Sequence, residues 1–138
     1  MASFLFKTEP GEYAFADLER EKQTVWSGIK NPTALIHLRT VRKGDRVVIY
    51  HSGKDKAAVG TAVAESDPYP DPKLGDPKRV VLDLKPVRAL ARRVAIAEFR
   101  ADPVLKQTEL IRITRLSVMP LTAAQFDRVL DLSKRRAP

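Results

Sequence analysis

Short runs of apolar and β-branched residues, separated by polar turns, predict a series of short strands along the chain. Their aromatic and branched side chains suit a pleated, half-buried surface, and glycine, proline and aspartate separate the runs. The segments that we expect to form strands are 3–7, 46–50, 57–65, 80–85 and 115–120. A short polar stretch joins the second and third of these, so we expect the two to pair antiparallel. Pro86 is expected to end the fourth strand, with residues 87–94 continuing the sheet irregularly.

Apolar residues three and four positions apart indicate short helices among these strands. The expected helical segments are 15–21, 32–40, 96–101, 104–110 and one that follows residue 122. Asn31 precedes a proline and is placed to cap the second helix. The last helix is the best specified, since Thr122 and Gln125 form a capping box and Leu121 and Phe126 can pack as a hydrophobic staple.

A few helices between short, mostly antiparallel strands predict an α/β protein of the α+β kind, built as a small, partly open barrel. Residues 66–78 contain four prolines in thirteen positions, which argues against regular structure there. A chain of 138 residues is long enough for one core, so we expect a single domain over 1–138 in which 133–138 form a basic tail. The cations Arg88, Arg92 and Arg93 are expected to be solvated.

The charge balance narrows the choice of partners. With 43% hydrophobic and 30% charged residues the chain is an ordinary globular protein, but its net charge of +8 favours an anionic partner such as nucleic acid. The absence of cysteine excludes disulfides, thiolate metal sites and cysteine nucleophiles. No apolar run approaches the roughly 20 residues of a membrane span, and no secretory signal begins the chain. We therefore expect a soluble cytoplasmic protein, associated with the nucleoid if it binds DNA.

Residues 26–31, Trp-Ser-Gly-Ile-Lys-Asn, hold the only tryptophan and are the strongest candidate for a binding site. The aromatic face of Trp26, the tight backbone at Gly28, the ammonium of Lys30 and the amide of Asn31 together suit a flat, hydrogen-bonding ligand such as a nucleobase. Taken alone, however, these residues are more often explained by a core tryptophan and a helix cap.

Other markers follow the same order as a known family. They are Leu-Phe-Lys-Thr-Glu-Pro at 5–10, Asp-Leu at 17–18, the 26–31 segment, Gly-Asp at 44–45, Tyr-His-Ser at 50–52, Gly60, Tyr-Pro-Asp at 69–71 and Arg-Leu-Ser-Val-Met-Pro at 115–120. In this order and spacing, over about residues 3–130, the chain resembles the EVE domain of the PUA-like group, which includes the YTH readers of methylated adenine. Two positions depart from the family pattern: Ser3-Phe4 lacks the usual tryptophan, and Ala14 stands where a serine is common.

The resemblance implies a PUA-like pseudo-barrel of about five to six mostly antiparallel strands with flanking short helices. It also implies a pocket for a base flipped out of nucleic acid, because EVE proteins are linked to modified cytosines such as 5-methylcytosine. In such a pocket Trp26 would be the stacking platform. The Asn31 amide could pair with a base edge, although its position as a helix cap competes for the same oxygen. Glu9 is the only nearby carboxylate expected to accept from a cytosine amine, with an exposed turn acid as the alternative.

The expected ligand-binding residues are Lys7, Thr8, Glu9, Trp26, Ile29, Lys30, Asn31, His51, Ser52, Tyr69 and Asp71. The expected phosphate contacts are Arg39, Arg42 and Lys43, with a solvated helix end as the alternative. His51 and Ser52 are adjacent on a strand and point to opposite faces, and no orienting acid is identifiable, so they do not predict hydrolysis. A structural role for His51 is favoured. His37 has no second histidine at ligand spacing, so no metal and no cofactor is expected.

These observations predict a non-enzymatic module that reads a modified base, with a flipped modified cytosine in DNA favoured. The alternatives are an RNA-binding PUA-like module and, less favoured, an enzyme that acts on nucleic acid.

Overall fold

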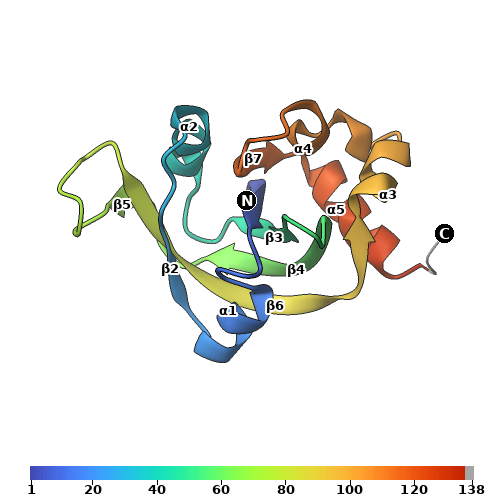
Figure 1. Ribbon diagram of the computed structural model, residues 1–138, viewed down its shortest axis with the longest axis horizontal. Coiled ribbons are helices and arrows are strands. Elements are labelled where there is room, and N and C mark those ends of the chain that lie inside the picture. The colour runs from blue at the N-terminus through green and yellow to red at the C-terminus, as the bar shows by residue number, and fades with distance from the viewer. Residues whose placement is uncertain (136–138) are drawn as a thin grey trace.

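One strongly curved sheet organises the computed structural model, which describes residues 1–135 (Figure 1). Its strands run in the order β2-β6-β4-β3-β1-β7, and β5 pairs with β6 beside this path. The strands are β1 (Ser3–Thr8), β2 (Thr24–Trp26), β3 (Arg46–His51), β4 (Ala57–Ala64), β5 (Tyr69–Pro70), β6 (Val80–Ala95) and β7 (Val118–Leu121). Only the β1–β3 pair is parallel among the pairs of this sheet within residues 1–135, so the expectation of a mostly antiparallel sheet is confirmed.

The curl of the sheet brings two of its aromatic residues, Phe6 and Trp26, into contact. Strands β1 and β2 are separated by β6, β4 and β3 in the strand order. Nevertheless the rings of Phe6 on β1 and Trp26 on β2 are only 5.6 Å apart between centroids. Such an approach requires the sheet to bend into a half-barrel, which brings its β2 edge back towards β1.

Helices cover the ends of this half-barrel (Figure 1). They are α1 (Phe15–Glu21), α2 (Pro32–Thr40), α3 (Ile96–Ala101), the 3-10 turn η1 (Leu105–Gln107), α4 (Glu109–Arg112) and α5 (Ala123–Ser133). The helices expected over 15–21, 32–40 and 96–101 are confirmed. The segment expected over 104–110 is divided, because Thr108 is extended (φ −69°, ψ 154°) and separates η1 from α4. No helix within residues 1–135 is long and apolar enough to cross a bilayer.

The fourth strand does not end at Pro86, because β6 continues through it to Ala95, whereas the irregular continuation of the sheet expected over 87–94 is confirmed by two register shifts against β4. Thr61 lies opposite Arg88 and Ala62 opposite Pro86, so one extra residue of β6 bulges at this point. A bulge is one of the few places where a sheet tolerates a proline, since the missing N–H interrupts no regular ladder. Two smaller differences concern β5, a two-residue strand inside the proline-rich segment, and β7, which begins at Val118 rather than at residue 115.

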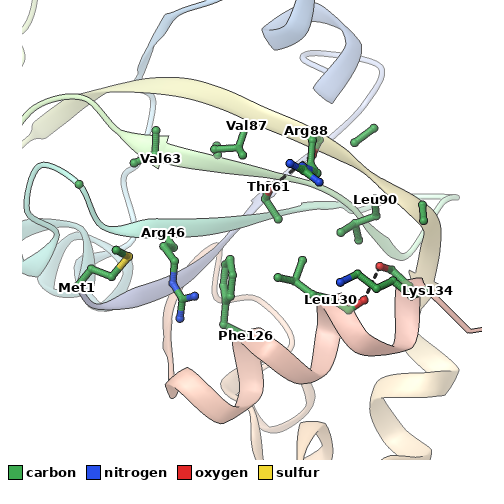
Figure 2. A pocket seen from close by; sticks show the side chains of 15 residues that line it. Met1, Arg46, Thr61, Val63, Val87, Arg88, Leu90, Phe126, Leu130 and Lys134 are labelled. Carbon is green, nitrogen blue, oxygen red and sulfur yellow. Dashed lines mark hydrogen bonds between the residues drawn. The ribbon is translucent and has the colours of Figure 1, made fainter.

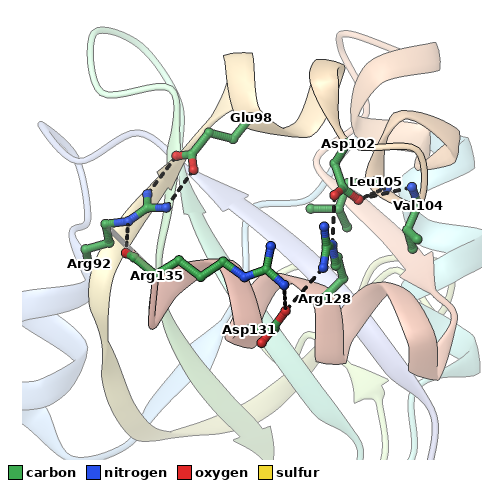
Figure 3. Close-up of polar contacts among 8 residues, drawn as sticks. All are labelled: Arg92, Glu98, Asp102, Val104, Leu105, Arg128, Asp131 and Arg135. Carbon is green, nitrogen blue, oxygen red and sulfur yellow. Dashed lines mark hydrogen bonds and ion pairs between the residues drawn. The ribbon is translucent and has the colours of Figure 1, made fainter. Parts of the chain in front are cut away.

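Ion pairs fasten the last helix to the rest of the fold (Figure 3). The Arg92 guanidinium donates to both oxygens of Glu98, at 2.8 and 2.9 Å, and its Nε donates to the Arg135 carbonyl. The expectation that Arg92 is solvated is therefore wrong. Arg128 on α5 donates to Asp102 at 2.7 Å. Arg92 on β6 therefore bridges α3 and the end of α5, and the Arg128–Asp102 pair joins α5 to the residue that follows α3. Residues 136–138 of the expected basic tail lie outside the described residues.

Candidate nucleic-acid interface

A hollow of about 320 Å³ lies where the end of β1, the turn before α1 and strand β2 meet. We call it the Trp26 hollow; it is lined by Thr8, Glu12, Tyr13, Thr24, Val25, Trp26 and Ser27. Its volume is at the lower end of the range for small-ligand sites. Two aromatic rings, four hydroxyl groups, one carboxylate and one apolar side chain contribute to its walls. This combination suits a small, flat, polar molecule.

Trp26 belongs to the core and to the hollow at the same time. Its residue surface is only 7% exposed. The indole packs against the Phe6 ring at a tilt of 36° and meets the Tyr13 ring edge-on, with centroids 6.1 Å apart. The core role and the pocket role that the sequence leaves open are therefore compatible. The geometry also implies that truncating Trp26 removes core packing together with the wall of the hollow.

Tyr13, Glu12 and Thr24 line the hollow although sequence reasoning did not single them out. The Tyr13 hydroxyl donates to Glu21 Oε1 at 2.7 Å. Burial, together with the charge of Glu21, raises the pKa of Tyr13, so the hydroxyl keeps its proton at neutral pH. The signal that could have indicated Tyr13 is an aromatic residue inside an otherwise polar turn, two residues before a helix begins.

Helix α1 holds that turn in place, and His51 holds the helix. The Phe15 ring lies over Gly60 so closely that a Cβ at that position would come within 2.4 Å of the ring. The Phe15 N–H donates to His51 Nε2 at 3.0 Å, and His51 Nδ1 lies 3.0 Å from Asp55 Oδ2. Because Nε2 accepts, Nδ1 carries the proton and donates to Asp55. Both ring nitrogens of His51 are thus engaged, in agreement with a structural role.

Glu9 does not line the Trp26 hollow in the described chain. Its Oε1 accepts from the Gly11 N–H at 2.9 Å. Its other oxygen lies over Gly53, where a Cβ would come within 2.3 Å of it. The carboxylate that faces the hollow is that of Glu12 instead, so the expectation that Glu9 is the only nearby carboxylate is wrong. Ser52 does not line the hollow either; its backbone N–H donates to the Thr8 carbonyl and so supports the end of β1.

The remaining residues of the first strand and of the 26–31 segment point to other partners. Lys7 alternates with Phe6 and Thr8 along β1 and therefore lies on the opposite face. Its Nζ donates to the Thr114 carbonyl at 2.8 Å, and burial lowers its pKa. The Asn31 side chain accepts from the N–H groups of Thr33 and Ala34, which confirms the helix cap.

The segment that follows Trp26 runs over the surface towards α2. The Ile29 carbonyl accepts from Arg79 Nε at 3.0 Å, while Lys30 is exposed. Ser27 is the residue of this segment that lines the hollow directly after Trp26.

A second hollow, of about 530 Å³, adjoins the first across strand β2. It is lined by Gln23, Thr24, Val25, Ser27, Tyr69, Asp71, Pro72 and Lys73, and it shares Thr24, Val25 and Ser27 with the Trp26 hollow. The Tyr69 hydroxyl donates to Asp83 at 2.7 Å, and this bond raises the pKa of Tyr69 to about 12. Tyr69 and Asp71 are therefore brought beside the Trp26 hollow rather than into it.

The expected phosphate contacts lie at the end of α2. Arg39 donates to the Lys78 carbonyl at 3.0 Å, which ties α2 to the segment before β6. Arg42 donates to the carbonyls of Arg39 and Val41. Arg39, Arg42 and Lys43 are all exposed. Each cation therefore remains accessible to an anionic partner on this side of the molecule.

A third hollow, of about 630 Å³, lies between α5 and the β4–β6 face and is less suited to a nucleobase (Figure 2). Figure 2 shows Phe126, its only aromatic wall among the described residues, beside Arg46. The Arg46 guanidinium lies 4.0 Å from the centroid of that ring. This contact occupies the ring face on which a base would stack.

Comparison with known proteins gives a consistent result. Residues 2–132 match the model of the EVE domain family. Thymocyte nuclear protein 1 of Homo sapiens is 29% identical over 166 aligned residues, covering 96% of this chain and 74% of that protein.

Two solved structures extend the comparison to the fold. The solution structure of Rpa0253 from Rhodopseudomonas palustris has a TM-score of 0.91 at 32% identity, covering 96% of this chain and 93% of that one. Human THYN1 in complex with DNA that contains 5-methylcytosine has a TM-score of 0.91 at 27% identity, covering 99% and 100% of the two chains. The expected PUA-like fold is thereby confirmed, and the chain belongs to the EVE domain family.

Proposed function

We propose that this protein is a non-enzymatic nucleic-acid-binding module that reads a modified base in the Trp26 hollow. A flipped modified cytosine in DNA is the favoured ligand. The observation that carries the proposal is the composition of the hollow, in which an indole, a carboxylate, hydroxyls and one apolar side chain surround a space of about 320 Å³. The human THYN1 complex with 5-methylcytosine DNA supports the choice of ligand.

Each part of a methylated cytosine finds a matching group in this hollow. The ring stacks against the aromatic wall of Trp26 and Tyr13, an interaction worth roughly 1–3 kcal/mol per base. The Glu12 carboxylate accepts from the exocyclic amine, as acidic side chains do when they recognise cytosine. Thr8 and Thr24 supply hydroxyls for the other polar edge atoms. Val25 alternates with Thr24 and Trp26 along β2 and is half-exposed, so it offers the 5-methyl group an apolar contact at the edge of the hollow.

The strand that carries the base is held through its phosphates by exposed cations. These are Lys30, four residues after Trp26, and Arg39, Arg42 and Lys43 at the end of α2. Binding through phosphates weakens steeply with salt, so affinities must be compared at one ionic strength. Extracting a base from a duplex costs a few kcal/mol, so a single strand binds more tightly than a fully paired duplex.

Fluorescence anisotropy with three single-stranded oligonucleotides tests the proposal. The strands differ at one position, which is cytosine, 5-methylcytosine or 5-hydroxymethylcytosine. Wild-type protein is expected to prefer one of the modified strands. Glu12→Gln replaces the acceptor carboxylate and lowers affinity for all three by about tenfold, since a hydrogen bond to a charged group is worth about 1.5–3 kcal/mol.

Glu19→Gln is the matched control, because Glu19 is an exposed acid on α1 outside the lining of the Trp26 hollow. It leaves every affinity unchanged apart from the small gain of removing one negative charge. Equal binding of wild type to all three strands would reject base reading. Competition with an RNA strand of the same sequence decides between DNA and the RNA-binding alternative. The enzymatic alternative is disfavoured because both nitrogens of His51 are already bonded.

A further inference from the structure

The loop between β5 and β6, residues 71–79, projects from the sheet beside β2 and α2 (Figure 1). Its shape is fixed by hydrogen bonds at both ends. The Asp71 N–H donates to the Arg79 carbonyl at 2.8 Å, which closes the base of the loop. Within it, Asp71 and Asp76 accept from the N–H groups of Lys73 and Lys78 at 2.9 Å each. The loop is therefore a defined projection of the surface.

Leu74 lies on this projection with half of its surface exposed. It stands before Gly75, whose φ of +65° provides the turn, and next to the exposed ammonium group of Lys73. A single exposed leucine is ordinary on a protein surface. Here, however, it is the only aliphatic side chain in the proline-rich segment 66–78 apart from the proline rings.

The loop that carries Leu74 begins close to the Trp26 hollow. Pro72 and Lys73, the two residues before Leu74, line the second hollow. That hollow shares Thr24, Val25 and Ser27 with the Trp26 hollow, so only strand β2 separates the start of the loop from the candidate base site. The start of the loop therefore lies across β2 from a base held in the Trp26 hollow.

We propose that Leu74 is an apolar wedge that enters the base stack of a duplex and occupies the space left by the flipped base. Apolar side chains that insert between base steps unstack them and stabilise the distorted duplex. Lys73 and Lys78, which are exposed on the same loop, hold the phosphates around the opened step. This inference rests on the proposed function, since a wedge is useful only if a base is extruded.

A comparison of duplex with single strand tests the wedge. Wild type, Leu74→Ala and Leu74→Met are titrated against a 12-base-pair duplex with one 5-methylcytosine paired to guanine, and against the modified strand alone. Leu74→Ala is expected to lose about tenfold in affinity for the duplex, because unstacking costs a few kcal/mol per step. It is expected to bind the single strand as wild type does, because no stack needs to be held open. Leu74→Met keeps an apolar side chain of similar size and retains duplex binding.

Val87→Ala is the matched control, because Val87 is 56% exposed and lies at the separate hollow beside α5 (Figure 2). It changes neither affinity. Equal losses on duplex and single strand for Leu74→Ala would make Leu74 a general contact and overturn the wedge, as would no loss at all. If wild type itself fails to prefer the modified single strand, the proposed function fails first, and this result is visible before any variant is measured.

Discussion

At the scale of single residues, Trp26 and the polar side chains around it divide between the hollow and local hydrogen bonds. Thr8 and Trp26 line the hollow, whereas Glu9 binds back to the Gly11 N–H and lies against Gly53. A short polar side chain beside a turn can bond locally or reach a ligand, and only the fold decides which. Tyr13 could have been proposed from its place in a polar turn.

Tyr69 allows a prediction about alkaline pH. Its bond to Asp83 raises its pKa to about 12, so the folded state disfavours the phenolate. The stabilisation is complete below pH 10, the ordinary tyrosine value, and is lost as the pH rises towards about 12. We expect Tyr69→Phe to lower the free energy of unfolding at pH 8 and to reduce its decline above pH 10. Urea titrations at pH 8, 10 and 11 measure both; an unchanged decline would contradict the assignment.

At the scale of elements, local signals were sufficient for the helix caps. The caps at Asn31 and Thr122 are formed as the sequence predicts, since both depend on residues within three positions. Pro86 was misread because the extra residue that accommodates it is defined only by the register between β4 and β6. A pairing register depends on residues that are far apart in the sequence, so the proline alone does not predict the bulge.

Helix α1 offers a test at this scale, because its cap lacks a side-chain acceptor. Ala14 has extended backbone angles (φ −98°, ψ 162°), and its N–H already donates to Asp17 at 2.8 Å. Ala14→Ser would complete the capping box and raise the free energy of unfolding by about 1 kcal/mol. Ala16→Ser, at an exposed position inside the same helix, should give no gain. Chemical denaturation compares the two, and equal effects would refute the cap explanation.

At the scale of the whole molecule, the order of strands and helices predicts a partly open barrel, but not which strands meet across it. The contact between Phe6 and Trp26 joins strands that are far apart in the strand order. The Trp26 hollow depends on this closure, which explains why five of its seven lining residues are absent from the expected ligand-binding set.

The attachment of α5 gives a prediction about acid. Burial alone would raise the pKa of Asp102, but Arg128 and the N–H groups of Leu105 and Val104 outweigh it and hold that pKa below its usual value (Figure 3). The resulting stability is present above about pH 3.9 and is lost as the pH falls below it. Asp102→Ala should cost about 2–3 kcal/mol at pH 7, because it removes the acceptor of Arg128 and leaves the Val104 and Leu105 N–H groups without theirs.

Asp131→Asn is the control for that experiment, since Asp131 also pairs with Arg128 but is 52% exposed. Its effect should stay below about 1 kcal/mol. Equilibrium unfolding at pH 7 and pH 3 is the measurement, and the gap between the two variants should narrow at pH 3. A similar cost for both variants would show that Asp102 does not anchor α5.

The fluorescence of Trp26 tests the central claim most directly. Trp26 is the only tryptophan in the sequence and lines the proposed site, so all tryptophan emission reports on that site. Wild-type protein is titrated with single strands that contain cytosine or 5-methylcytosine at one position, at fixed salt. Stacking against Trp26 predicts saturable quenching, reached at a lower concentration of the methylated strand. Binding that is visible by anisotropy but leaves Trp26 emission unchanged for both strands would place the nucleic acid elsewhere on the protein and contradict the account.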